Sequence, residues 1–375
     1  MIVSNYFLHF LSRELKPVIE NSFINKVQLI DKHLLKFKLN TRKGTKDLII
    51  GKEVIYITDY SMQAVESRHS FIESLRKHLF NKVIKEFKVK ENERIAYVET
   101  DNCFLIFELF SKSNIILTDK NWEIISCYFN EKWKDRTIRK GFTYQFPLKK
   151  VNPFELKEKE FKLKLKESKN DLIRFLVRDL QLSPLIAENI TFSLKLDKKA
   201  KLNELKKKDF ENVFEKIKWF YSKEIEKNLQ PTVVKINDEL VFLPVKLESL
   251  KEKEVVLEKS KLNELLDETI TKEIMFKQEN LEKEGFNKKI GKVEHNLKEQ
   301  LEAKEKFENQ IKDNQLKAKL LYFNYSKVKA MMEAVKKGRE KKLSEKEIMS
   351  KIQSVENWLV GLNLKEKKIV VELNE

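Results

Sequence analysis

Glycine is scarce in this chain, with seven glycines among 375 residues. Loops that cradle phosphates, such as G-x-x-x-x-G-K-[ST] and G-x-G-x-x-G, need several glycines at fixed spacing, and the sequence contains neither pattern. The motifs G-x-S-x-G and H-E-x-x-H are also missing. The five histidines have no metal-ligand spacing with either cysteine. We therefore expect no catalytic activity, no cofactor and no metal site.

Cysteine is scarcer still, with Cys103 and Cys127 the only two. Both stand in apolar surroundings, which indicates a reducing compartment and no disulfide framework. Residues 1–15 contain no basic segment, and their apolar run is too short for a signal peptide or a membrane span. We expect a soluble cytoplasmic protein with no membrane partner.

Arginine is the rare cation here. Lysine and arginine together number 76 against 59 acidic residues, a formal net charge of +17. This excess suits a polyanion, RNA or DNA before a membrane, but general lysine richness with solvated faces explains it equally well. Where a lysine-biased chain still uses arginine, a planar fork for phosphate or stacking is one reason. Seven arginines fall within the first 139 residues: Arg13, Arg42, Arg68, Arg76, Arg94, Arg136 and Arg139.

Hydrophobic spacing predicts an α+β domain over residues 1–155. Apolar residues recur every three or four positions in residues 1–20 and 69–87, which predicts helices. Pro147 and Pro153 indicate the exit from this domain. Alternating or apolar runs predict two sets of antiparallel strands, at 27–30, 34–39, 47–51 and 53–58, and at 93–99, 103–109, 114–119 and 123–129.

A second domain is predicted over residues 156–260. Residues 170–227 have a helical pattern, with Pro184 at the turn of a helical pair. Residues 231–247 predict a β-hairpin that turns at Asn237.

A third domain, over residues 261–375, is predicted to be a coiled-coil arm with a tip. The helical pattern runs from 262 to 335. Ser344 and Glu347 form a capping box for one more helix, which we expect to end at Gly361, and the last residues predict a strand.

The arm carries a heptad seam over residues 290–335. Its a and d positions are apolar or aromatic except Gln300, Lys304 and Asn314. A seam sustained over more than three heptads is typical of a coiled coil, and 46 residues make a helix roughly 70 Å long. Because the chain ends at Glu375, we expect a second polypeptide to supply the pairing helix. Its predicted contacts are Ile290, Val293, Leu297, Phe307, Ile311, Leu321 and Val328.

Aromatic residues alternate with cations between residues 128 and 144. The rings are Tyr128, Phe129, Trp133, Phe142 and Tyr144, with lysines and arginines among them. Exposed rings would stack on bases while the cations contact phosphates, which suits RNA. The alternative is a strand-loop-strand with ordinary core aromatics.

Five segments, taken in order, resemble the NFACT family of ribosome quality control factors. The family includes RqcH and the nuclear export mediator factor, and its members are often named fibronectin-binding proteins. The segments are RELK at 13–16, the LRKHL helix at 75–79, E-L-F…N-I-I-L-T-D at 108–119, R-x-x-x-x-G-x-x-Y-x-x-P at 136–147, and the helical pair at 176–190 followed by the seam.

The resemblance implies a fold and a role. The N-terminal domain would be related to the N-terminal part of formamidopyrimidine-type glycosylases, followed by a helix-hairpin-helix domain and the coiled coil. Such glycosylases use an N-terminal proline that this chain lacks, so no repair chemistry is expected. The implied role is non-enzymatic: binding the large ribosomal subunit with stalled peptidyl-tRNA, and recruiting tRNA for C-terminal tailing of the nascent chain. The alternative is a coiled-coil scaffold without tRNA selection.

The sequence departs from the family pattern at three places. The tRNA-contacting Asp-Arg pair of the family falls at Glu93 and Arg94, and its early aspartate aligns near Phe7. The returning coiled-coil helix and the NFACT-R domain do not follow residue 375, and we expect the second polypeptide to supply both. The candidate RNA and tRNA contacts are Glu93, Arg94, Arg76, Lys77, His78, Arg136 and Arg139.

Overall fold

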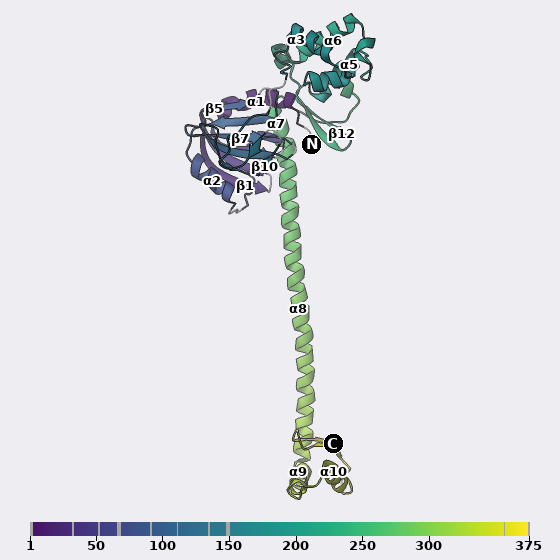
Figure 1. Ribbon diagram of the computed structural model, residues 1–375. Coiled ribbons are helices and arrows are strands. Elements are labelled where there is room, and N and C mark those ends of the chain that lie inside the picture. The colour runs from purple at the N-terminus through teal and green to yellow at the C-terminus, as the bar shows by residue number, and fades with distance from the viewer. Residues whose placement is uncertain are drawn as a thin grey trace. The chain divides into compact units, whose positions relative to one another are not determined.

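The computed structural model describes the chain apart from residues 1–2, 32–33, 52, 66–68, 91, 111, 134–135, 148–150, 356 and 374–375. The chain divides into two units, Met1–Gln278 and Glu279–Glu375 (Figure 1). The three-domain division expected from the sequence stays a prediction.

Two antiparallel sheets form the N-terminal part of the first unit, as predicted. The Phe37 ring of the first sheet lies edge-on to the Phe107 ring of the second, with centroids 6.2 Å apart. The first sheet has the order β1 (Phe23–Asp31), β2 (Leu34–Thr41), β3 (Gly44–Gly51) and β4 (Val54–Thr58). The second has the order β5 (Glu86–Val89), β6 (Ile95–Glu99), β7 (Cys103–Glu108), β8 (Asn114–Asp119) and β9 (Ile124–Cys127), and β10 (Glu131–Lys132) pairs with β11 (Thr137–Ile138).

Two helices accompany these sheets: α1 (Asn5–Ile19) and α2 (Ser70–Leu79). The prediction of one helix over residues 69–87 was wrong beyond Leu79. Asn81 takes a left-handed φ of 55°, which ends the helix, and its backbone N–H donates to the Ile24 carbonyl of β1 at 2.8 Å. The apolar residues after this point belong to strand β5 and its approach rather than to a helical face.

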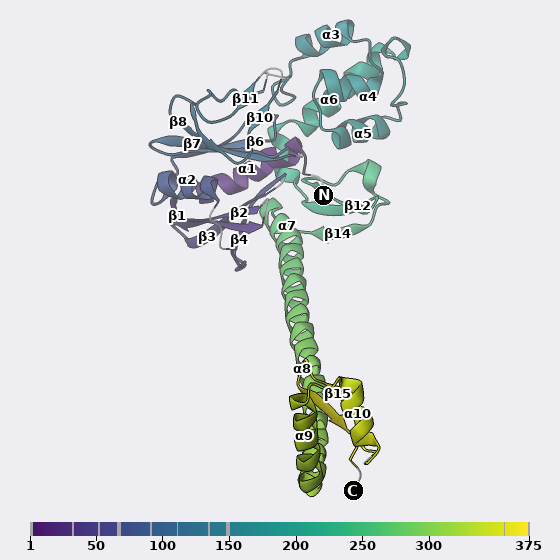
Figure 2. The same ribbon diagram turned by 60° about the horizontal axis from the view of Figure 1, so that its bottom comes forward.

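Short helices and a small sheet complete the first unit. Pro184 stands at the first turn of α5, where its missing N–H leaves no intrahelical bond unmade. The predicted hairpin is confirmed, with Asn237 and Asp238 both at positive φ in its turn. The elements are α3 (Glu158–Glu167), α4 (Leu172–Arg174), α5 (Pro184–Ser193), α6 (Lys207–Phe220), β12 (Thr232–Ile236), β13 (Glu239–Leu243) and β14 (Val255–Glu258), in the sheet order β13-β12-β14 (Figure 2).

Helix α1 joins these parts into one core. The Tyr6 hydroxyl donates to the carbonyl of Phe220 at 2.7 Å, and the His9 ring stacks on Phe154 at 3.7 Å. Burial, with a smaller contribution from nearby Arg13, lowers the pKa of His9 to about 4, so this imidazole is neutral near pH 7. Sequence-distant segments therefore share one hydrophobic cluster with α1.

The long helix of the arm begins inside the first unit. Helix α7 (Leu262–Leu266) continues through one π-helical turn, Asp267–Thr271, into α8 (Lys272–Phe323). With 52 residues, α8 is about 78 Å long. The predicted continuous helix to residue 335 was wrong at its end, because Asn324 leaves helical geometry at φ −100° and ψ 22°.

The second unit ends in a small tip with its own core. It contains α9 (Tyr325–Glu340), α10 (Glu345–Gln353) and a hairpin of β15 (Leu359–Asn363) and β16 (Lys368–Val371). The predicted capping box is confirmed, because Ser344 accepts from the N–H of Glu347 and the Glu347 carboxylate accepts from the N–H of Ser344. The predicted helix end at Gly361 was wrong, since that residue lies in β15.

We predict that Gly338→Ala destabilises the tip. A β-carbon at Gly338 would lie 2.8 Å from Cγ1 of Ile348, which is buried where α9 meets α10. Moving the Ile348 side chain away from the new β-carbon should lower the stability of the tip by about 1–2 kcal/mol, after the gain in helix propensity is subtracted. Hydrogen exchange of amides 331–371 should become faster.

The matched control is Gly291→Ala on α8, where an added β-carbon meets nothing within 4 Å. This change should only favour the helix, by about 1 kcal/mol. Equal behaviour of the two variants would contradict the close approach of α9 and α10.

Candidate nucleic-acid interface

The turn before β6 is held by the amide side chain of Asn92. This residue has φ 52°, and its Nδ2 donates to the carbonyls of Val151 at 3.2 Å and Gln181 at 3.1 Å. Its Oδ1 accepts from Nδ2 of Asn5 at 2.7 Å. Three segments far apart in sequence thus fix the backbone that precedes Glu93 and Arg94.

Arg94 is positioned by two neighbours and remains partly exposed. Its Nη1 lies 3.2 Å from Oε1 of Glu53, and its guanidinium carbon lies 5.9 Å from the Phe110 ring centroid. The side chain is 32% exposed. Because a guanidinium has five N–H donors, this ion pair leaves donors for a phosphate. Glu93 is half-buried beside it.

Arg136 has a structural role instead. Its Nη1 lies 2.5 Å from Oε1 of Glu108, and the two side chains are 9% and 2% exposed. The Tyr144 hydroxyl donates to the same oxygen at 2.8 Å. Burial raises the pKa of Glu108, and Arg136 opposes this rise. The sequence prediction of Arg136 as an RNA contact stays a prediction, and the structure adds that its guanidinium is paired with a buried carboxylate.

A hollow of about 250 Å³ lies next to this buried pair. Trp133 is 50% exposed, and its Nε1 donates to Oε2 of Glu131 at 3.1 Å. Phe110, which contacts Arg94, also lines the hollow. We call it the Trp133 hollow; its lining residues are Glu108, Phe110, Lys112, Ser113, Asn114, Glu131, Trp133 and Arg136.

The Trp133 hollow offers aromatic rings for stacking but no net positive charge. Glu108 and Arg136 neutralise each other, which leaves Lys112 and Glu131 with opposite charges. An exposed indole offers a stacking face for any base, and Arg94 and Lys112 can contact phosphates. The rings between residues 128 and 144 differ in exposure: Phe129, Trp133 and Phe142 are exposed, whereas Tyr144 is buried.

The basic residues of α2 occupy its last turn. The Nε of Arg76 donates to the Val27 carbonyl at 3.0 Å, and Nδ1 of His78 lies 2.9 Å from the Ser74 carbonyl oxygen. Lys77 is exposed. Cations at this position also stabilise the helix dipole, so Arg76 and His78 have local structural contacts. The hydrogen bond to Val27 holds the Arg76 guanidinium against β1, although the residue as a whole is exposed.

Arg139 lies on the surface, whereas Phe7 lies in the core. Arg139 is exposed, and its carbonyl accepts from the N–H of Phe142 at 3.1 Å in the turn that Gly141 makes at φ 84°. Phe7 has no exposed surface and belongs to the core of α1, so nothing at this position can contact a ligand.

Sequence reasoning missed Asn92, Glu53 and Phe110 as site residues. Asn92 and Glu53 act through contacts between distant segments, which no local pattern indicates. Phe110 stands in the E-L-F signature, which served only as a family marker.

The predicted partner face of the arm is exposed. Six of its residues on α8 are between 45% and 66% exposed: Ile290, Val293, Leu297, Phe307, Ile311 and Leu321. Val328 differs, because it lies half-buried in α9. Val335, the last seam position, is buried within the tip rather than free for a partner.

Two antiparallel sheets around α1, followed by helices and a long helical arm, define a mixed α and β protein. A family model described as NFACT N-terminal and middle domains matches residues 4–374, and the chain belongs to this family. Among the residues that the structure describes, none of the helices combines the length and the apolar content that a bilayer crossing requires.

Two curated relatives have names from ribosome quality control. The chain is 31% identical over 322 residues to the archaeal Rqc2 homolog aRqcH of Methanocaldococcus jannaschii, covering 80% of this chain and 46% of that protein. It is 29% identical over 124 residues to ribosome quality control complex subunit 2 of Saccharomyces cerevisiae, covering 32% and 12% respectively. The chain thus spans less than half the length of either relative.

Two solved structures of similar fold are named as fibronectin- or fibrinogen-binding proteins. The N-terminal part of the fibronectin/fibrinogen-binding protein from Streptococcus suis has a TM-score of 0.57 at 20% identity, covering 72% of this chain and 100% of that chain. The fibrinogen-binding protein from Staphylococcus aureus has a TM-score of 0.53 at 20% identity, covering 70% and 97%. At this identity the likeness shows the fold alone.

We predict that Glu108→Gln destabilises the first unit by about 3 kcal/mol, because it leaves the buried guanidinium of Arg136 without its counter-charge. The midpoint of urea denaturation, followed by tryptophan fluorescence, should fall accordingly. The double variant Glu108→Leu with Arg136→Met should recover part of the loss.

The matched control is Glu99→Gln, which removes the partner of Lys120 in a more exposed pair. Its effect should stay below about 1 kcal/mol. An equally small effect of Glu108→Gln would contradict the structural role of the buried pair.

Proposed function

We propose that this chain is a non-catalytic, RNA-binding factor of ribosome quality control. In this proposal it binds the large ribosomal subunit that carries a stalled peptidyl-tRNA, and it recruits tRNA for C-terminal tailing of the nascent chain. The main support is the family match over residues 4–374, together with two relatives named for ribosome quality control. The formal charge of +17 fits a polyanionic partner.

Arg94 and the Trp133 hollow are the proposed RNA contacts. Arg94 stands where the resemblance expects the arginine of a tRNA-contacting pair, and Asn92 and Glu53 fix its position. Phe110 connects it to the hollow, so a nucleotide could place its phosphate on Arg94 and its base on Trp133. Lys77 and Arg139 are exposed cations that extend this proposal, whereas Arg136 is paired with a buried carboxylate.

We predict that Arg94→Ala weakens tRNA binding by about five- to tenfold, because it removes one phosphate contact. Filter retention at several salt concentrations should also give a slope of log affinity against log salt that is shallower by about one. Trp133→Ala in the same titrations should weaken binding without changing that slope, since stacking releases no counterion.

The controls keep charge loss separate from site loss. Arg42→Ala removes one arginine from the exposed β2–β3 turn, and Trp219→Ala removes a ring of 44% exposure on α6. Both should bind tRNA like the unaltered chain. Unchanged binding by Arg94→Ala, with the fold intact by circular dichroism, would remove Arg94 from the interface.

The exposed face of α8 supports a second candidate function, a coiled-coil scaffold. We propose that a helix from a second polypeptide covers this face, as the sequence analysis predicts. In the quality control role that polypeptide would also bring the NFACT-R domain, whereas a scaffold needs the pairing helix alone and no tRNA selection. Six large apolar side chains in a heptad pattern are more than a solvated helix needs. RNA affinity that is independent of salt would favour the scaffold over the RNA-binding role.

We predict that α8 is the most protease-sensitive part of the chain when it is purified alone. Its stabilising contacts in the middle are i,i+4 pairs such as Lys304 with Glu308, each worth about 0.2–0.5 kcal/mol. Limited proteolysis should therefore cut within residues 290–323 before it cuts the first unit or the tip, residues 325–371. A monomer whose arm is fully helical and resists protease would contradict the need for a partner helix.

A further inference from the structure

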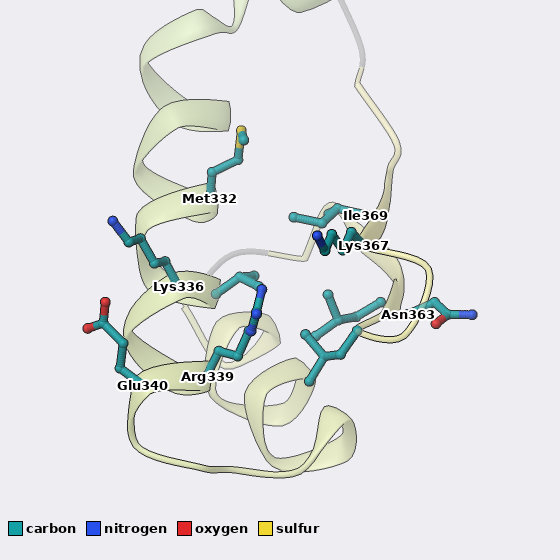
Figure 3. A pocket seen from close by; sticks show the side chains of 10 residues that line it. Met332, Lys336, Arg339, Glu340, Asn363, Lys367 and Ile369 are labelled. Carbon is teal, nitrogen blue, oxygen red and sulfur yellow. The ribbon is translucent and has the colours of Figure 1, made fainter.

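The tip of the second unit contains a groove between α9 and the β15–β16 hairpin (Figure 3). Its volume is about 440 Å³. Helix α9 contributes one wall and the hairpin contributes the other. The lining residues are Met332, Val335, Lys336, Arg339, Glu340, Leu362, Asn363, Leu364, Lys367 and Ile369. All of them belong to the second unit, so the groove is complete within the tip.

The inner surface of the groove is apolar. Leu362 and Ile369 are direct partners in the antiparallel register, and both line it from the hairpin. Val335 of α9 also lines the groove and is buried, and Met332 remains 58% exposed. The core of the tip fixes this surface, since Val335 is among its buried residues with Ile348 of α10. The groove therefore exists before any ligand binds.

Two cations face each other across this surface. Arg339 extends from α9 and Lys367 from the hairpin, and both point into the groove (Figure 3). Lys367 stands in the tight turn at φ 55°, which sets the direction of its side chain. Neither cation has an ion-pair partner among the residues that the structure describes. Lys336 also lines the groove, but its amine points away from it (Figure 3).

We propose that this groove binds a short acidic and hydrophobic peptide segment of a partner protein. Carboxylates of the peptide pair with Arg339 and Lys367, and its apolar side chains cover Met332 and the hairpin. The lining contains no aromatic ring for base stacking, and only two cations converge, so a peptide fits better than RNA. This docking site is independent of the proposed RNA contacts of the first unit.

The test uses the full chain and a fluorescein-labelled peptide in which leucine and glutamate alternate. Fluorescence anisotropy should show saturable binding that Arg339→Glu weakens by at least about tenfold, because repulsion replaces an ion pair. Met332→Glu should weaken it too, and its exposed position leaves the tip folded. A peptide with lysine in place of glutamate should not bind.

The matched control is Lys336→Glu, which makes the same charge change on the same helix with the side chain directed away from the groove (Figure 3). It should change affinity by less than about twofold. Equal losses from Lys336→Glu and Arg339→Glu would overturn the groove as the site, as would binding of the lysine peptide. If Arg339→Glu instead abolished retention of poly-uridine RNA while no peptide bound, the peptide proposal would be wrong. tRNA binding through Arg94 is measured separately, so the two proposals can fail independently.

Discussion

The carboxylate of Glu14 on α1 holds the start of the helical arm. Its two oxygens accept from the backbone N–H groups of Leu262 and Asn263, each at 2.9 Å, at the beginning of α7. Helix α7 has no side-chain cap of its own, so this distant carboxylate satisfies two donors that would otherwise be unpaired. Burial raises the pKa of Glu14, and the two backbone hydrogen bonds oppose the rise. The side-chain amide of Asn263 then donates to the carbonyl of Ile57 in β4 and accepts from the N–H of the same residue.

This contact gives the family signatures a physical meaning. In RELK, Arg13 pairs with Glu226 and Glu14 caps α7, so the motif joins α1 to two later segments. Glu108 of the segment 108–119 binds Arg136 and Tyr144 of the segment 136–147. Glu14, Glu108 and Arg136 thus connect segments that are distant in the sequence. Phe110 lines the Trp133 hollow, Arg94 is partly exposed, and the cations Lys77 and Arg139 are exposed, so these residues remain accessible to a ligand.

Local structure could be predicted from the sequence, and connections between segments could not. Strand alternation and the capping box of Ser344 depend on near neighbours, so both were confirmed. The helix prediction was wrong for residues 80–87 because their apolar spacing fits a helix. The left-handed conformation of Asn81, which turns the chain, cannot be read from that spacing. The ion pair of Arg136 could not be foreseen for a related reason. Its sequence neighbours are basic and aromatic, but its partner Glu108 lies on another strand.

The arm itself shows how order is distributed along a long helix. Helices lose order first at their ends, where backbone groups lack partners. Here the beginning is capped by Glu14 and the end leads into α9, whose Met331 and Val335 are buried in the tip. Both ends are therefore stabilised by tertiary contacts. The middle has only weak i,i+4 pairs and an exposed apolar seam, broken by the polar Gln300, Lys304 and Asn314. A pairing helix would add most stability in this middle part, and the three polar positions would fix its register.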